Sequence, residues 1–184
     1  MILLRHGQSE FNLHITAIGR DPGIIDPKLT PLGHVQARRA AEALRGHGIT
    51  RIIASPYTRT LQTAAPIARA LGLPVEINPV VRERYALSCD IGSRISQQKP
   101  RWPEHDFQRI EEIWWPQTEE PVDHVMLRAG LFRREMQAGA NWRTTLVVSH
   151  WGFILALTGE KVVNGQLLTC DPFGPEPSAF DWRH

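Results

Sequence analysis

The sequence has little of what marks several protein classes. Its longest apolar stretches are a handful of residues, whereas a helix that crosses a bilayer needs about 20, so we expect no transmembrane helix. The first residues lack the charged head and long apolar run of a signal peptide, so we expect a protein that is not exported and lies in the cytoplasm. Neither sign of charge is in excess, since 21 Lys and Arg residues stand against 19 Asp and Glu residues. That balance favours neither nucleic acid nor a membrane as a partner.

Cysteine is also scarce. The two cysteines, Cys89 and Cys170, lie far apart and outside any CxxC pattern, so we expect ordinary reduced thiols rather than a zinc knuckle. Arg94 follows Cys89 one residue too early for the C-x5-R loop with which cysteine phosphatases hold phosphate. The P-loop pattern GxxxxGKS/T and the HExxH pair are both missing. The sequence therefore indicates neither a nucleoside triphosphate site nor a zinc site of those kinds.

Short apolar runs alternate with longer helical patterns, which is typical of an α/β fold built on a mostly parallel sheet. With 42% apolar and 22% charged residues in a chain of 184, we expect one domain over residues 1–184 with its own core. The predicted strands are 2–4, 51–54, 75–77 and 145–149. The predicted helices are 31–44, 57–71 and 122–137, the second of them kinked or broken at Pro66. From residue 171 onward, prolines and glycine indicate irregular chain draped over the surface.

Residues 84–121 interrupt this alternation. We interpret them as a lid-like insertion over part of one sheet edge, with a loose helical pattern at 107–113. The insertion contains lysine and arginine residues close in sequence to tryptophans. We hypothesise that five of its residues, together with Arg20, bind the non-reacting part of a substrate. They are Lys99, Arg101, Trp102, Trp114 and Trp115. The alternative is a lid packed on its own tryptophans.

Polar side chains follow three of the predicted strands directly. Arg5 and His6 follow the first strand, His150 follows the last, and Arg59 lies one turn into the helix after the second. The carboxyl ends of parallel strands meet at one edge of a sheet, where ligands bind, so these four side chains should converge. Guanidinium groups match the oxygens of a phosphoryl group, and the sequence therefore predicts a phosphate pocket.

The segments around these residues resemble a known family. LRHGQSEFN at 4–12, DPKLTPLGHVQA at 26–37, SPYTRTLQTA at 55–64 and SHWG at 149–152 occur in the order found in the histidine phosphatase superfamily, phosphoglycerate mutase-like branch (branch 1). One motif alone would be weak, but four in this order are specific. The resemblance spans residues 2 to about 158.

The resemblance implies a three-layer α/β/α sandwich and a phosphatase that acts on a small phosphorylated metabolite through a phosphohistidine. The implied site consists of His6 as the nucleophile, Arg5, Arg59 and His150 as a phosphate clamp, Asn12 and Ser9 as further substrate contacts, and Glu83 as the proton donor. The clamp supplies positive charge, so we expect no metal and no cofactor.

Elementary chemistry adds expectations for these residues. The His6 ring attacks phosphorus only if one nitrogen is bare, so its other nitrogen needs an acceptor such as the Gly7 carbonyl. Gly7 is expected to leave room for phosphate, and His150 to be positively charged.

Glu83 has an alternative role, and the role of proton donor has a second candidate. Glu83 is alternatively a surface salt-bridge partner of Arg82 or Arg84, and Asp90 is the next candidate for the proton donor.

Relatives often have a small residue directly after the histidine that corresponds to His150, whereas this chain has Trp151. We therefore expect Trp151 to form an aromatic wall that binds the substrate. The substrates of the family do not carry over to this chain for the same reason. The insertion is also shorter than in the mutases, which favours a phosphatase over a phosphoglycerate mutase-type phosphotransferase. The alternative from another class is a non-catalytic module that binds a phosphorylated ligand. Retention of a nucleophile and an acid favours the enzyme. The sequence specifies no oligomeric state.

Overall fold

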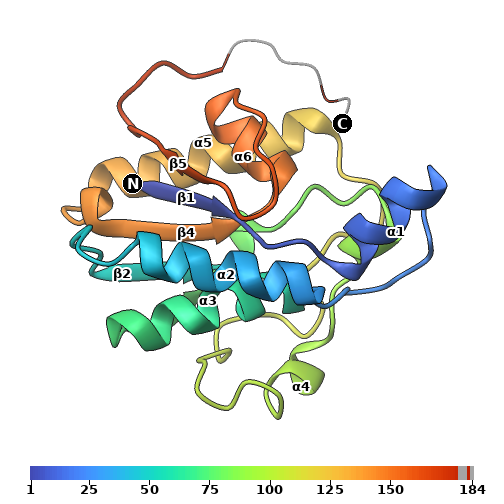
Figure 1. Ribbon diagram of the computed structural model, residues 1–184. Coiled ribbons are helices and arrows are strands. Elements are labelled where there is room, and N and C mark those ends of the chain that lie inside the picture. The colour runs from blue at the N-terminus through green and yellow to red at the C-terminus, as the bar shows by residue number, and fades with distance from the viewer. Residues whose placement is uncertain (178–181, 183–184) are drawn as a thin grey trace.

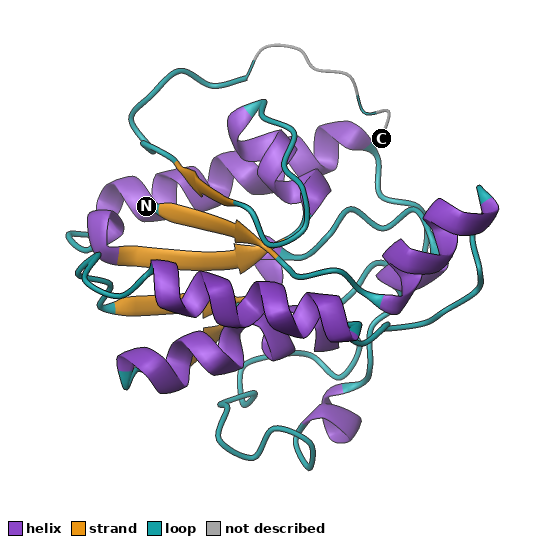
Figure 2. Ribbon diagram, viewed as in Figure 1, coloured by secondary structure: helices purple, strands orange, loops and turns teal. Residues whose placement is uncertain are grey.

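A computed structural model describes residues 1–177 and residue 182 of the chain. Its centre is a five-stranded sheet in the order β3-β2-β4-β1-β5, shown in Figures 1 and 2. The four predicted strands are present as β1 (Ile2–Arg5), β2 (Arg51–Ala54), β3 (Val75–Ile77) and β4 (Thr145–Ser149), all parallel. A fifth strand, β5 (Leu167–Thr169), pairs antiparallel with β1 at the edge and was not predicted.

Helices cover both faces of the sheet (Figure 1), which confirms the three-layer sandwich. On one face lie α2 (Pro31–Ala43) and α3 (Thr58–Leu71), and on the other lie α5 (Val122–Ala138) and α6 (Trp151–Thr158). Successive strand residues face opposite layers, as the two-residue period of a strand requires. Ile52 packs into the core under α2 and α3, whereas Ile53 packs into the core under α5 and α6.

The helix α3 contradicts one of the two outcomes predicted at Pro66, a kink or a break. It runs without a break from Thr58 to Leu71 with Pro66 inside it. Leu61 and Ile67, on either side of the proline, are fully buried in the core. Burial of these two side chains, each worth about 2 kcal/mol, offsets the backbone hydrogen bond that proline removes.

The segment 84–121 is mostly turns and irregular chain, with one short helix, α4 (Ile95–Gln98). The helical pattern predicted at 107–113 does not form a helix. The side chains of Phe107 and Trp114 are instead buried in the core on the α3 side of the sheet. The Trp114 ring packs edge-on against the Tyr57 ring, with the ring centroids 4.5 Å apart. Aromatic side chains of the insertion therefore anchor it to the core of the sandwich.

A further helix, α1 (Glu10–Ile18), lies beside the carboxyl ends of the strands (Figure 1). Its amino terminus is capped by Ser9, whose hydroxyl accepts the Asn12 N–H. No helix in the described part of the chain is long and apolar enough to cross a membrane.

Candidate active site

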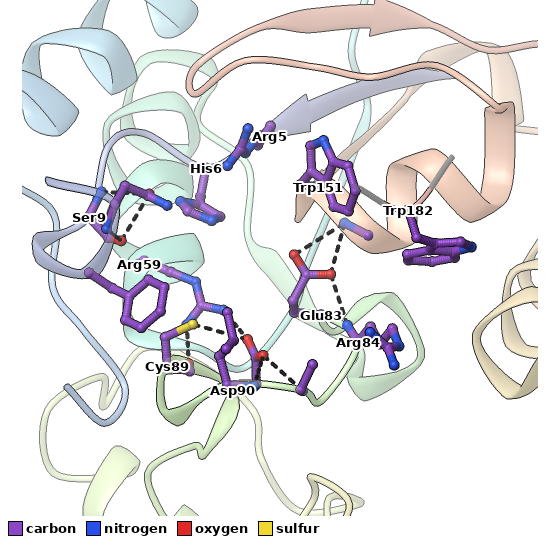
Figure 3. Close-up of a pocket in the computed structure, with 15 residues that line it drawn as sticks. Arg5, His6, Ser9, Arg59, Glu83, Arg84, Cys89, Asp90, Trp151 and Trp182 are labelled. Carbon is purple, nitrogen blue, oxygen red and sulfur yellow. Dashed lines mark hydrogen bonds and ion pairs between the residues drawn. The ribbon is translucent and has the colours of Figure 1, made fainter. Parts of the chain in front are cut away.

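A pocket of about 230 Å³ opens at the carboxyl ends of β1 and β4. Arg5 and Ser149 are register partners at the ends of these two strands, so the residues that follow them emerge side by side. Figure 3 shows the side chains of the pocket converging from β1, α3, the start of α6 and the segment after β3. Of the residues predicted to form the site, the pocket is lined by Arg5, His6, Ser9, Asn12, Arg59, Glu83, Asp90 and Trp151.

His6 directly follows β1 and is 3% exposed. Its Nδ1 lies 2.7 Å from the Gly7 carbonyl oxygen, which can only accept, so Nδ1 carries the proton and Nε2 is bare. This is the arrangement expected of a nucleophilic imidazole. Burial, reinforced by the charges of Arg59 and Arg5, holds the pKa of His6 well below its ordinary value. The ring is therefore neutral at physiological pH.

Gly7 has a different role from the one expected. A Cβ atom on Gly7 would lie 2.5 Å from the Gly33 carbonyl oxygen, and a Cβ on Gly33 would collide with the Gln8 carbonyl oxygen. The two glycines let the loop after β1 pack directly on the first turn of α2. Gly7 is thus required by backbone packing rather than by space for phosphate.

Two guanidinium groups flank His6. Arg5 donates to the Val162 carbonyl oxygen at 2.7 Å, and burial lowers its pKa to about 10, so it stays charged at neutral pH. Its Nε is buried with no hydrogen-bond partner among the described residues. Arg59 donates to the Cys89 carbonyl oxygen at 2.8 Å and lies 3.4 Å from an Asp90 oxygen. Both cations are fixed in place, as a phosphate clamp requires.

His150 occupies the N-cap position of α6 and is fully buried. Its Nε2 lies 2.6 Å from the Ser55 hydroxyl, which lies 2.9 Å from the Thr60 hydroxyl. Thr60 donates its proton to backbone carbonyls, so Ser55 donates to Thr60 and accepts from His150. The proton of a neutral His150 is therefore on Nε2.

This arrangement corrects the expected charge of His150. Burial, with the charges of Arg59 and His6 added, holds the pKa of His150 well below its ordinary value. In this structure His150 is a neutral ring and not the expected cation. Its Nδ1 is buried with no hydrogen-bond partner among the described residues, and the His6 ring lies 5.2 Å away.

Glu83 lies beside the amino terminus of α6 (Figure 3). Its carboxylate accepts the Gly152 N–H at 2.9 Å and the Arg84 N–H at 2.8 Å. The alternative interpretation of Glu83 as a salt-bridge partner of Arg82 or Arg84 is wrong. Arg82 pairs with Glu120 and Arg84 pairs with Glu119.

Asp90 is a second carboxylate in the same pocket. It is 3% exposed, and one of its oxygens accepts the N–H groups of Ala86 and Leu87 at 3.1 and 3.0 Å. Burial, together with the nearby charge of Glu83, raises the pKa of Asp90 to about 6. The pocket therefore holds two acidic groups, of which Asp90 is the one tied to Arg59.

Asn12 is oriented by its neighbours. Its Oδ1 accepts from the Ser9 N–H at 3.1 Å, from the Ser9 hydroxyl at 2.9 Å and from the Asn164 amide at 3.1 Å. With three donors on Oδ1, the Asn12 amide nitrogen remains to donate into the pocket. Asn164 also donates to the His6 carbonyl oxygen at 3.1 Å. The sequence reasoning missed Asn164, whose only signal was an Asn-Gly turn outside every motif.

The aromatic wall contains one expected and one unexpected residue. Trp151 is 6% exposed and lines the pocket, as predicted, and Trp182 lies against it with ring centroids 6.0 Å apart. Trp182 lies in the tail that the sequence indicated only as surface chain. No local pattern could have placed it in the pocket.

Arg20, predicted to bind the non-reacting part of a substrate, lies outside the pocket. It is exposed beyond the end of α1. Trp102 stacks on His105, and Trp114 contacts both Trp115 of the insertion and Tyr57 of the sandwich. A role of these rings in binding a substrate stays a prediction.

Cys89 and Cys170 are free and buried, as expected of ordinary thiols. Within residues 1–177 and 182, no group of three or more His, Cys, Asp and Glu side chains is arranged to hold a metal ion.

The chain is similar to a family of known proteins. The sequence pattern of the histidine phosphatase superfamily (branch 1) matches residues 1–165. Phosphoserine phosphatase 1 of Hydrogenobacter thermophilus is 32% identical over 157 residues, 82% of this chain and 70% of that protein. Glucosyl-3-phosphoglycerate phosphatase of Mycolicibacterium vanbaalenii is 29% identical over 170 residues, 86% of this chain and 72% of that protein.

Two further matches differ in extent. The probable phosphoglycerate mutase GpmB of an Enterobacter species is 46% identical over 81 residues, which is 44% of this chain and only 36% of that protein. The solved structure of a mycobacterial glucosyl-3-phosphoglycerate phosphatase with VO3 superposes with a TM-score of 0.65 at 24% identity. That superposition covers 91% of this chain and 88% of the other and shows the shared fold.

Proposed function

Because the chain belongs to the histidine phosphatase superfamily (branch 1), we propose that it hydrolyses phosphate monoesters of small metabolites through a phosphohistidine on His6. The observation that carries the proposal is the state of His6. Its Nδ1 proton is fixed on the Gly7 carbonyl, and its bare Nε2 lies in the pocket with two clamped guanidinium groups. A binding module needs the cations but has no use for an oriented, neutral imidazole.

The first half of the reaction transfers the phosphoryl group. Arg5, Arg59 and the Asn12 amide hold its oxygens while His6 Nε2 attacks phosphorus and the bond to the ester oxygen breaks. Glu83, entering as the acid, gives its proton to the departing alkoxide. His150 neither gains nor loses a proton in this step: its neutral ring keeps the Nε2 proton on Ser55, with its centroid 5.2 Å from that of the His6 ring.

The second half returns the enzyme to its starting state. Glu83, now a carboxylate, takes a proton from water as the water oxygen attacks phosphorus and the bond to His6 Nε2 breaks. Inorganic phosphate leaves, and Glu83 is protonated again. The products are one alcohol and one phosphate for each ester and water consumed.

Hydrolysis is favoured over a mutase reaction by the extent of the similarities. The phosphatase relatives match 82% and 86% of this chain, whereas the GpmB relative matches 44%. We also place the protein in the cytoplasm, with a small substrate and neither nucleic acid nor membrane as partner. Its two buried free thiols are compatible with a reducing compartment.

The test is a panel of phosphorylated metabolites with released phosphate as the readout, combined with rapid quenching in base. Hydrolysis of at least one ester together with an acid-labile, base-stable phosphoprotein supports the proposal. Transfer of phosphate to phosphoglycerate without net release would indicate the mutase. Tight binding with neither event would indicate the binding module.

Removal of metal should leave the rate unchanged. Arg5 and Arg59 already supply two positive charges to the phosphoryl group, so a divalent cation would have little left to neutralise. The measurement is turnover before and after dialysis against a strong chelator. A rate that collapses and returns only with added magnesium or zinc would contradict this mechanism.

The two histidines should titrate at unusually low pH. Because burial and the arginines lower the pKa of His6 and of His150, both rings stay neutral until the pH falls well below 6.5, the ordinary histidine value. Activity that depends on the bare His6 nitrogen is therefore lost only as the pH falls through that lowered pKa. NMR titration of the ring Cε1–H signals, assigned by substitution, measures both values. A midpoint at or above 6.5 for His6 would contradict the neutral nucleophile.

A further inference from the structure

The pocket has two chemically different sides. Arg5 and Arg59 gather at the side of the nucleophile, where the phosphoryl group binds under the proposed function. On the Glu83 side, across from Ser9 in Figure 3, the wall is formed by Trp151 and Trp182. Leu87 also lines the pocket and is partly buried. The leaving group of an ester held on His6 must pass Glu83, so this is the side that it contacts.

Trp182 is seated against the catalytic groups rather than merely near them. A Cβ atom on Gly152 would lie 3.2 Å from Cζ3 of the Trp182 ring and would collide with a Glu83 oxygen. Only glycine at this position lets the indole and the Glu83 carboxylate both rest on the first turn of α6. The Trp151 ring meets Trp182 at an interplanar angle of 79°, and the Arg84 guanidinium lies 5.7 Å from the Trp182 ring centroid.

The same side offers little to a negative charge. Arg84 is the cation that lines it, and its guanidinium already donates to Glu119 and to the Glu120 carbonyl oxygen. The other ionisable group there, Glu83, becomes a carboxylate when it gives up its proton. An anionic leaving group would therefore depart beside like charge and find a cation that is already paired.

We infer that this side of the pocket selects esters whose alcohol is uncharged and carries a flat ring, with Trp151 and Trp182 as the specificity-determining contacts. The inference rests on the proposed function, since it assigns the leaving group of that reaction. Indole rings offer a large, rigid apolar face and pack well against other rings. Esters of carboxylate-bearing alcohols, such as 3-phosphoglycerate, should be poor substrates.

The test compares 2-phenylethyl phosphate with ethyl phosphate, because both leave as primary alkyl alcohols and differ in the ring. In the wild type, kcat/KM for the ring ester should be higher by about tenfold or more, and 3-phosphoglycerate should be the poorest of the three. Trp182→Ala should lower kcat/KM for the ring ester by about tenfold more than it lowers kcat/KM for ethyl phosphate. Trp182→Phe should restore most of the loss.

Phe173→Ala is the matched control, because Phe173 is an aromatic residue of the same tail that is 61% exposed and packs on Trp142. It should leave both esters unchanged. Equal rates for the two esters in the wild type, or equal losses in Trp182→Ala, would overturn the inference.

Binding of 2-phenylethylphosphonate and ethylphosphonate, measured by calorimetry, separates this inference from the proposed function because phosphonates are not turned over. A ring preference that Trp182→Ala abolishes supports the inference even if no ester is hydrolysed. Equal affinity of the two phosphonates overturns it even if hydrolysis and the phosphohistidine are both found.

Discussion

His6→Ala should abolish turnover, with kcat falling by about 10⁴-fold or more, because the variant loses the atom to which phosphorus is transferred. The neighbouring His150 cannot replace it. Its Nε2 is committed to Ser55, and the ring is 0% exposed. Steady-state turnover and quenching with radiolabelled ester measure the loss, and no phosphoprotein should be trapped.

His14→Ala is the control for this substitution, since His14 is exposed on α1 and does not line the pocket. It should keep the wild-type rate, and circular dichroism should show both variants folded. If His6→Ala retains more than a trace of activity, or if base-stable phosphoprotein still forms in it, the covalent step is not on His6.

The positions of His6 and His150 could be predicted because each follows a strand whose apolar run ends abruptly. Residues 2–4 and 146–148 have no polar interruption, and the arginine, serine and histidines come directly after them. The strands are parallel and in register, so the two histidines had to meet. An unbroken apolar run with a sharp end carries this information locally.

The helix α6 was not predicted, although it begins at the site. Its residues from Trp151 to Leu157 are all buried, so the segment is apolar on every side and shows no helical period. The edge strand β5 has three residues, like β3, but none of them is buried, whereas Val75 and Ile77 of β3 are. Both elements are determined by what packs around them rather than by their own sequence.

Two residues at the site also could not be predicted from the sequence. Asn164, which contacts Asn12 and the His6 carbonyl oxygen, and Trp182, which lines the pocket, both lie outside every motif of the sequence. The protonation of His150 was predicted wrongly for a related reason. Its burial and the hydroxyl chain through Ser55 are properties of the folded protein, and they decide where the ring carries its proton.

Glu83→Gln should separate proton donation from phosphate binding. If Glu83 is the acid, the variant should hydrolyse an alkyl ester such as ethyl phosphate about 10²–10⁴-fold more slowly, because the alkoxide must then leave unprotonated. An aryl ester such as p-nitrophenyl phosphate should lose much less, since its phenolate leaves without a proton. The ratio of kcat/KM values for the two esters is the measurement.

Arg59→Ala is the comparison variant. Its guanidinium holds the phosphoryl group whatever the leaving group, so both esters should slow together, by about 10²–10³-fold. A ratio that shifts in Arg59→Ala as strongly as in Glu83→Gln would show that the assay does not distinguish the two roles.

Asp90 is the competing donor, and pH tells the two carboxylates apart. An acid must be protonated to act, so the rate with the alkyl ester should fall as the pH rises through the pKa of the donor. Burial and the charge of Glu83 raise the pKa of Asp90 to about 6, but its carboxylate is held by Arg59 and two backbone N–H groups. Glu83, in contrast, lies between the nucleophile and the leaving-group side (Figure 3). The alkaline limb should therefore vanish in Glu83→Gln and persist in Asp90→Asn. The reverse result, with equal losses on both esters in Glu83→Gln, would make Asp90 the acid.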